Sequence, residues 1–142
     1  MIVRRVVFDT SMLVSAALRL DSIPHRALLR ALASCDLCAS VVTLTELKEV
    51  LAREKFSAYL AADARNRFLQ TIENSVLRFA VEDEDLLSLD PACRDPKDNI
   101  FLALAAVSEA GILISSDEDL LVLDPWNGVR VVRPAEFLDI AE

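Results

Sequence analysis

Four carboxylic acids occupy places where predicted strands end or predicted helices begin. Asp9 directly follows the first apolar run of the chain, and Asp117 follows a later one after two serines. Glu46 and Asp98 each lie in the first turn of a predicted helix. Carboxylates gathered in one place repel one another, and such a cluster persists when a divalent cation compensates its charge. Ligation by oxygen alone favours Mg²⁺ or Mn²⁺, so these four acids are candidate ligands of such an ion.

Each acid taken singly also has a structural explanation. The run Thr43-Leu44-Thr45-Glu46 matches a capping box, in which Glu46 bonds the backbone N–H of Thr43. The run Asp95-Pro96-Lys97-Asp98 matches an Asp N-cap, a proline at the first helical position and an acid that complements the helix dipole. Asp9 and Asp117 can likewise favour helix starts. Capping alone gives no reason for four acids to meet at one edge, and we therefore favour the cation site.

The elements that must position these acids alternate between short strands and longer helices. The predicted strands span residues 3–8, 37–42, 76–81, 112–114 and 129–132. The predicted helices span residues 11–18, 25–33, a segment opening at Thr43, the region 56–72, residues 97–110 ending at a left-handed Gly111, and a terminal helix opening at Pro134. Residues 82–85 form an acidic segment that we expect to be solvated.

This alternation predicts an α/β fold, with three α/β/α layers and a mostly parallel central sheet. In such sheets, ligands bind beyond the carboxyl ends of the strands, near the point where strand order reverses. The four acids are all expected at that end. The pattern therefore predicts that they converge from four distant segments.

Length and composition agree with one cytoplasmic domain covering residues 1–142. The chain is 54% hydrophobic and 27% charged with two Gly, which excludes disordered and collagen-like chains. Its three cysteines indicate reduced thiols in a reducing compartment. We expect no membrane span, because no apolar run approaches about 18 residues, and no signal peptide at residues 1–5. The net charge of −8 argues against nucleic-acid binding through a broad basic surface.

Four stretches in order along the chain resemble a known family. They are residues 7–16 (VFDTSMLVSA), 44–51 (LTELKEVL), 94–105 (RDPKDNIFLALA) and 114–121 (ISSDEDLL), and residues 133–138 (RPAEFL) are similar to the family's usual ending. Together they resemble a PIN-domain ribonuclease of the kind found as the toxin of bacterial toxin–antitoxin pairs.

The resemblance implies a metal-dependent endoribonuclease that leaves a 5′-phosphate and a 3′-hydroxyl. It assigns metal binding and catalysis to Asp9, Glu46, Asp98 and Asp117, with Mg²⁺ or Mn²⁺ as the cofactor. It implies an RNA substrate and a cognate antitoxin, and it allows for a homodimer. Two positions depart from the family pattern: Ser11 stands where Asn is frequent, and Ser115-Ser116 stands where Thr-Gly is frequent. Asp119 is either an outer partner of the metal site or a helix-start acid, and we favour the second role.

Two other classes of function fit parts of the sequence. The chain can be a catalytically weak PIN-like binding module that acts through protein pairing, using its Leu- and Ala-rich helices. A phosphatase-type α/β enzyme fits fewer residues, because such enzymes place a second Asp where Ser11 stands. A zinc site is disfavoured, because its candidate ligands Cys35, Cys38, Cys93 and His25 lack a second closely spaced pair. Six basic residues are candidate phosphate contacts: Arg53, Lys55, Arg65, Arg67, Arg94 and Lys97.

Overall fold

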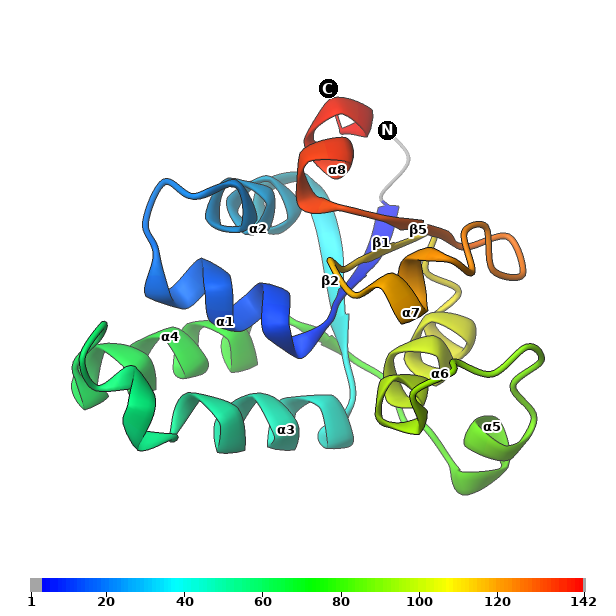
Figure 1. Ribbon diagram of the computed structural model, residues 1–142, viewed down its shortest axis with the longest axis horizontal. Coiled ribbons are helices and arrows are strands. Elements are labelled where there is room, and N and C mark those ends of the chain that lie inside the picture. Colours follow the sequence, from blue (N-terminus) through cyan, green and yellow to red (C-terminus); the bar gives the residue numbers. More distant parts are fainter. Residues whose placement is uncertain (1–3, 142) are drawn as a thin grey trace.

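Five parallel strands form the central sheet, in the order β3-β2-β1-β4-β5 (Figure 1). The computed structural model describes residues 4–141. The strands are β1 (Arg4–Phe8), β2 (Cys35–Ala39), β3 (Leu77–Arg78), β4 (Ile112–Ile114) and β5 (Arg130–Val132). The predicted first strand agrees with β1, except that Val3 lies outside the described residues. All four strand pairs are parallel, as the alternating pattern predicts.

Helices connect successive strands and cover both faces of the sheet. They are α1 (Thr10–Leu18), α2 (Ile23–Ser34), α3 (Val41–Leu51), α4 (Ala62–Ser75), α5 (Asp83–Leu87), α6 (Asn99–Ser108), α7 (Glu118–Leu121) and α8 (Pro134–Ile140). Two single 3₁₀ turns, η1 (Glu54–Phe56) and η2 (Pro96–Asp98), precede α4 and α6. No helix among residues 4–141 is both long enough and apolar enough to cross a membrane.

Side chains that alternate along the strands divide the core into two layers. Val6 and Phe8 of β1 pack with α1, α2, α3, α4 and α8, whereas Val7 packs on the opposite face with α6. Trp126, which is 2% exposed, belongs to the second layer. Figure 1 shows α1–α4 and α8 together, away from α5 and α6. The α/β/α prediction is confirmed.

The second strand ends earlier than the sequence pattern predicts. Residues 37–42 are predicted as a strand, but β2 ends at Ala39 and α3 begins at Val41. Ser40 accounts for the difference, because its hydroxyl accepts from the Thr43 N–H at 3.2 Å while Thr43 Oγ1 accepts from the Ser40 N–H at 2.9 Å. This reciprocal cap starts the helix despite two β-branched valines, whose side chains face solvent.

The helix before β4 ends without using Gly111 as its cap. The left-handed residue is Glu109, with φ 55°, and the Ala110 N–H donates to the Ala105 carbonyl at 3.0 Å. Ala110 is thereby turned into the core, where it is 4% exposed. Gly111 instead starts the sheet pairing, with its N–H donating to the Arg5 carbonyl at 3.0 Å.

The region 56–72 is not the continuous helix that its apolar spacing predicts. The helix is interrupted between η1 and α4, and the side chain of the buried Arg65 fixes the backbone around this interruption. The Arg65 guanidinium donates to the carbonyls of Leu51, Arg53 and Leu60. The predicted strand 76–81 shortens to the two residues of β3. In the acidic segment 82–85, residues 82–84 are exposed and Asp85 is half-buried, and the segment opens the short helix α5.

Candidate active site

The candidate site lies at the carboxyl ends of β1 and β4, where the strand order reverses. Phe8 pairs with Ile114 in register, so Asp9 and Ser115 follow directly from adjacent strands. The Asp9 N–H donates to the Ile114 carbonyl at 3.1 Å, which extends the pairing by one bond. Parallel α/β sheets bind their ligands beyond the carboxyl ends of the strands, at such a reversal of strand order.

The carboxylate of Asp9 is buried and accepts three hydrogen bonds. Asp9 is 4% exposed and forms the N-cap of α1. Its Oδ1 accepts from Ser11 Oγ and from the Met12 N–H, both at 2.9 Å, and its Oδ2 accepts from Ser115 Oγ. Burial raises the pKa of Asp9, the three hydrogen bonds oppose that shift, and the nearby Asp117 carboxylate adds to it. The predicted capping role is therefore real, and it also orients the acid.

Ser115 links Asp9 to Asp117. Its hydroxyl is fully buried, donates to Asp9 and accepts from the Asp117 N–H at 3.0 Å. Asp117 in turn caps α7, with Oδ1 accepting from the Asp119 N–H at 2.9 Å. Asp119 contacts Asp117 through its backbone and lies in the first turn of α7. Of the three serines at positions that depart from the family pattern, Ser11 and Ser115 thus both bond Asp9.

Asp98 approaches the same crevice from η2. It occupies the N-cap position of α6 but makes no capping hydrogen bond, so its carboxyl is not committed to the helix. Burial and the neighbouring Asp117 carboxyl raise the pKa of Asp98 to about 7, and the charges of Asp95 and Asp9 add to the shift. The preceding Asp95 caps η2 through the Lys97 N–H at 3.1 Å, as the sequence predicts.

Glu46 lies on the other side of Asp9, in the second turn of α3 rather than the first. Because the capping box of α3 is formed by Ser40 and Thr43, the predicted capping role of Glu46 is wrong. Glu46 is half-buried, which raises its pKa. A hydrogen bond with the Thr10 side chain opposes this rise, and the Asp9 charge adds to it. The side chain is therefore directed toward the start of α1.

The four acids lie toward the same end of the sheet without forming a closed set of metal ligands. Within residues 4–141, no three Asp, Glu, His or Cys side chains stand close enough together to hold a metal ion as placed. The donor chemistry nevertheless fits a hard divalent cation, since every candidate ligand is a carboxylate. Burial is the largest cause of the raised pKa values of Asp9, Glu46 and Asp98, and a neighbouring acid of the set adds to each rise: Asp117 for Asp9, Asp9 for Glu46, and both Asp117 and Asp9 for Asp98.

Two neighbours of the acids, Thr10 and Cys93, are not among the residues that the sequence predicts for this site. Thr10 is buried and lowers the pKa of Glu46. Cys93 is also buried, and its thiol lies 3.4 Å from the Asp119 carbonyl and 4.0 Å from Asp98 Oδ2. Cys93 precedes Asp98 by five residues across an irregular loop, so no periodic pattern could have placed it there.

The predicted phosphate contacts divide into two groups. The prediction of Arg65 as a phosphate contact is wrong, because the residue is only 7% exposed and its guanidinium donates to backbone carbonyls. The other five are exposed: Arg53, Lys55, Arg67, Arg94 and Lys97. The zinc candidate His25 instead accepts the Asp21 N–H on Nδ1 at 3.1 Å, next to the start of α2.

Solved structures share this fold at low sequence identity. PAE2754 from Pyrobaculum aerophilum superposes with a TM-score of 0.64 at 18% identity, covering 98% of this chain and 90% of that one. VapBC2 from Rickettsia felis, solved bound to a DNA fragment from its promoter, gives 0.62 at 11% identity, with 89% and 96% covered. VapC20 from Mycobacterium tuberculosis, titled a sarcin–ricin loop cleaving toxin, gives 0.56 at 18% identity, with 88% and 98% covered.

Comparison with curated protein sequences found no match. The family model described as the PIN domain matches residues 5–119, a span that runs from β1 into α7. That span contains Asp9, Glu46, Asp98 and Asp117. The resemblance seen in the sequence is confirmed at the level of the family: this chain belongs to the PIN domain family.

Proposed function

We propose that this chain is a metal-dependent endoribonuclease that hydrolyses RNA phosphodiester bonds as the toxin of a toxin–antitoxin pair. The observation that carries the proposal is the buried Asp9 carboxylate, held by Ser11, Ser115 and the Met12 N–H. Membership of the PIN family supports a nuclease. Asp98 and Asp117 lie within electrostatic reach of Asp9, and Glu46 approaches it from α3.

In this proposal Asp9, Glu46, Asp98 and Asp117 hold Mg²⁺ or Mn²⁺. When bound, the cation supplies a nucleophile near neutral pH and offsets charge on the phosphoryl oxygens. Ser115 and Ser11 keep the Asp9 carboxylate in one orientation, so it need not reorganise when the substrate arrives. Burial and the neighbouring Asp117 raise the pKa of Asp98 and so disfavour its ionised form, which a bound cation would stabilise; this supports the proposal. These residues therefore prepare the site for a cation and for the scissile phosphate.

The toxin role and the partners also belong to the proposal. VapBC2 and VapC20 share the fold, and their titles name a promoter-bound complex and a toxin that cleaves the sarcin–ricin loop. By analogy we expect an RNA substrate, a cognate antitoxin and action in the cytoplasm. A homodimer remains an additional expectation.

A second candidate is a binding module with little turnover that acts through protein pairing. It is favoured by the apolar side chains that the α1–α2 region exposes, since Leu20 is 78%, Ile23 42% and Leu29 52% exposed. Exposed apolar side chains gathered on one region mark interaction surfaces. The family match favours a nuclease over the phosphatase-type alternative.

Incubation of the purified chain with a structured RNA in Mg²⁺ separates these functions. The nuclease predicts fragments ending in 3′-hydroxyl and 5′-phosphate groups, detected by end-specific labelling. The binding module predicts intact RNA, and a phosphatase predicts phosphate release from a small phosphomonoester instead. The Asp9→Asn variant is the matched control, because it removes one charge and preserves the shape of the side chain.

A further inference from the structure

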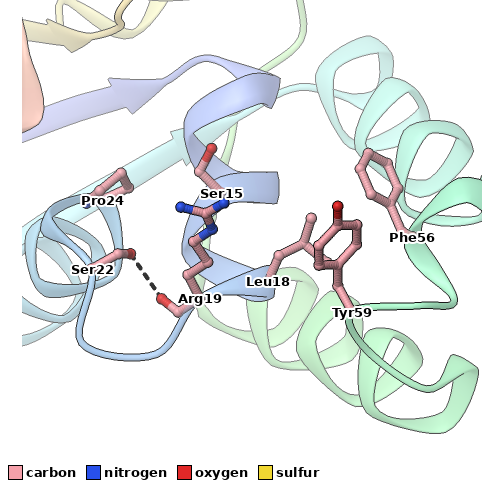
Figure 2. Close-up of a pocket in the computed structure, with 7 residues that line it drawn as sticks. All are labelled: Ser15, Leu18, Arg19, Ser22, Pro24, Phe56 and Tyr59. Atoms are coloured by element: carbon pink, nitrogen blue, oxygen red, sulfur yellow. Dashed lines mark hydrogen bonds between the residues drawn. The ribbon is translucent and has the colours of Figure 1, made fainter.

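A pocket of about 380 Å³ opens at the end of α1 that is distant from Asp9. Figure 2 shows the rings of Phe56 and Tyr59 on one side of it and Ser22 and Pro24 on the other, with Arg19 between them. Its full lining is Ser15, Leu18, Arg19, Ser22, Pro24, Phe56 and Tyr59. The volume is at the small end of the roughly 300–1,000 Å³ typical of ligand sites, which suits one small planar group.

The accessible face of α1 joins this pocket to the acids. Ser11, Ser15 and Arg19 follow at four-residue steps and so share one side of the helix. Ser11 bonds Asp9, and Ser15 and Arg19 line the pocket. The other side of α1 is buried in the core. At 1.5 Å per residue, Ser15 and Arg19 lie about 9 Å and 15 Å from Asp9 along the helix axis.

Arg19 is the positive charge of the pocket. It forms no ion pair with a carboxylate among residues 4–141. Its guanidinium lies beside Ser15 in Figure 2. On a chain with a net charge of −8, a cation without an acidic partner beside an apolar pocket favours an anionic ligand.

The aromatic wall is also open to solvent. Tyr59 is 65% exposed, although an aromatic ring is usually covered in a folded protein. Phe56 lies beside it but is half-buried against the core, and Lys55 Nζ lies 5.1 Å from the centroid of its ring. Tyr59 is therefore the open ring of this wall. An open aromatic ring next to a guanidinium is the combination on which proteins stack unpaired bases while holding the adjacent phosphate.

We propose that this pocket binds one unpaired nucleotide of the RNA substrate, with its base on Tyr59 and a phosphate at Arg19. The choice of RNA rests on the proposed function. At about 3.4 Å per stacked nucleotide, a strand along α1 places this nucleotide roughly three to four positions from the phosphate at Asp9. An apolar protein segment also fits the aromatic wall. RNA is favoured because Arg19 has no acidic partner in the described part of the chain and because Ser11 and Ser15 form a polar face of α1 between the pocket and the acids.

The test measures binding of a labelled octaribonucleotide by fluorescence anisotropy in EDTA, where the proposed cation-dependent cleavage cannot occur. Tyr59→Ala is expected to raise Kd by roughly fivefold to a hundredfold through loss of stacking, whereas Tyr59→Phe keeps the wild-type Kd. Arg19→Gln is expected to raise Kd and to reduce its salt dependence by about one phosphate contact. Arg26→Gln, which removes an exposed charge on α2, is the matched control. Circular dichroism melting checks that each variant folds.

Two results overturn the proposal. One is a Kd that is unchanged in both Tyr59→Ala and Arg19→Gln, which shows that the RNA does not enter the pocket. The other is an equal rise in Kd for Arg19→Gln and Arg26→Gln, which shows that the effect comes from the overall charge of the protein and not from the pocket. Because the probe is not cleaved, binding that depends on Tyr59 supports the pocket even if the chain fails to hydrolyse RNA. Conversely, hydrolysis of RNA with no dependence on Tyr59 overturns the pocket alone.

Discussion

Ser115 donates a hydrogen bond to Asp9 across 106 positions of the sequence and joins the two central strands at their carboxyl ends. The same hydroxyl accepts from the Asp117 N–H at 3.0 Å, so one buried side chain fixes two of the proposed metal ligands. Ser115 touches neither solvent nor the crevice directly, since it is fully buried. It is therefore a positioning residue.

Removal of the Ser115 hydroxyl should impair both the site and the fold. Ser115→Ala leaves Asp9 Oδ2 without its donor, and because that bond lowers the pKa of Asp9, the pKa should rise further. We expect cleavage to fall by at least roughly tenfold, as when a ligand's hydrogen-bond partner is lost. The free energy of unfolding should fall by about 1–3 kcal/mol. Ser116→Ala, at the exposed neighbour, should change neither quantity in parallel cleavage and urea-unfolding assays.

Replacement of Asp98 with Asn should stabilise the protein in EDTA. Because the folded-state pKa of Asp98 is about 7, above its usual 3.8, the folded chain binds more protons than the unfolded chain between those values. The melting temperature in EDTA should therefore fall as pH rises from about 4 to 7, and Asp98→Asn should flatten this dependence. The same variant should bind Mn²⁺ more weakly in calorimetric titrations. Unchanged Mn²⁺ affinity contradicts a site shared by the four acids.

Glu46→Gln tests the acid on α3. Since Ser40 and Thr43 supply the cap, the substitution should leave the melting temperature intact. It removes a charge and a hard oxygen ligand beside Asp9, so multiple-turnover cleavage should fall by at least roughly tenfold. Glu49→Gln, on an exposed position of the same helix, is the matched control. If Glu46→Gln cleaves RNA as fast as Glu49→Gln does, Glu46 is not part of the site.

Arg65 should matter for stability and not for RNA. Arg65→Leu leaves the carbonyls of Leu51, Arg53 and Leu60 without their shared donor, which should cost about 2–4 kcal/mol of unfolding free energy. Arg67→Leu, at an exposed position of α4, should cost less than about 0.5 kcal/mol. Urea unfolding of both variants provides the comparison. Equal stability of the two contradicts the structural role of Arg65.

The sequence predicts the architecture well because hydrophobic runs and helix spacing report which faces are buried. The predicted boundaries of helices and strands are wrong where a local hydrogen bond opposes the secondary-structure propensity of the residues. Val41 and Val42 favour a strand, but the Ser40–Thr43 cap makes them helical. Gly111 is the expected left-handed residue. In the structure Glu109 adopts that conformation instead, and the turn at Glu109 buries Ala110 in the core.

For the candidate site, residue type and position relative to strand ends indicate which acids to consider. They do not reveal the partners that hold those acids. Ser115 is visible in the sequence only as a departure from the family pattern, and its bond to Asp9 depends on the register of β1 and β4. Cys93 and Thr10 reach the site through tertiary contacts that have no sequence period.

The central claim is that the crevice at Asp9 hydrolyses RNA with a divalent cation. The most direct measurement is the initial rate of RNA cleavage by the wild-type chain and by Asp9→Asn, titrated with Mg²⁺ after treatment with EDTA. We predict no cleavage in EDTA, a saturable rise with Mg²⁺ for the wild type, and a rate at least roughly a hundredfold lower for Asp9→Asn. Cleavage that persists in EDTA, or an Asp9→Asn rate equal to that of the wild type, would contradict the claim.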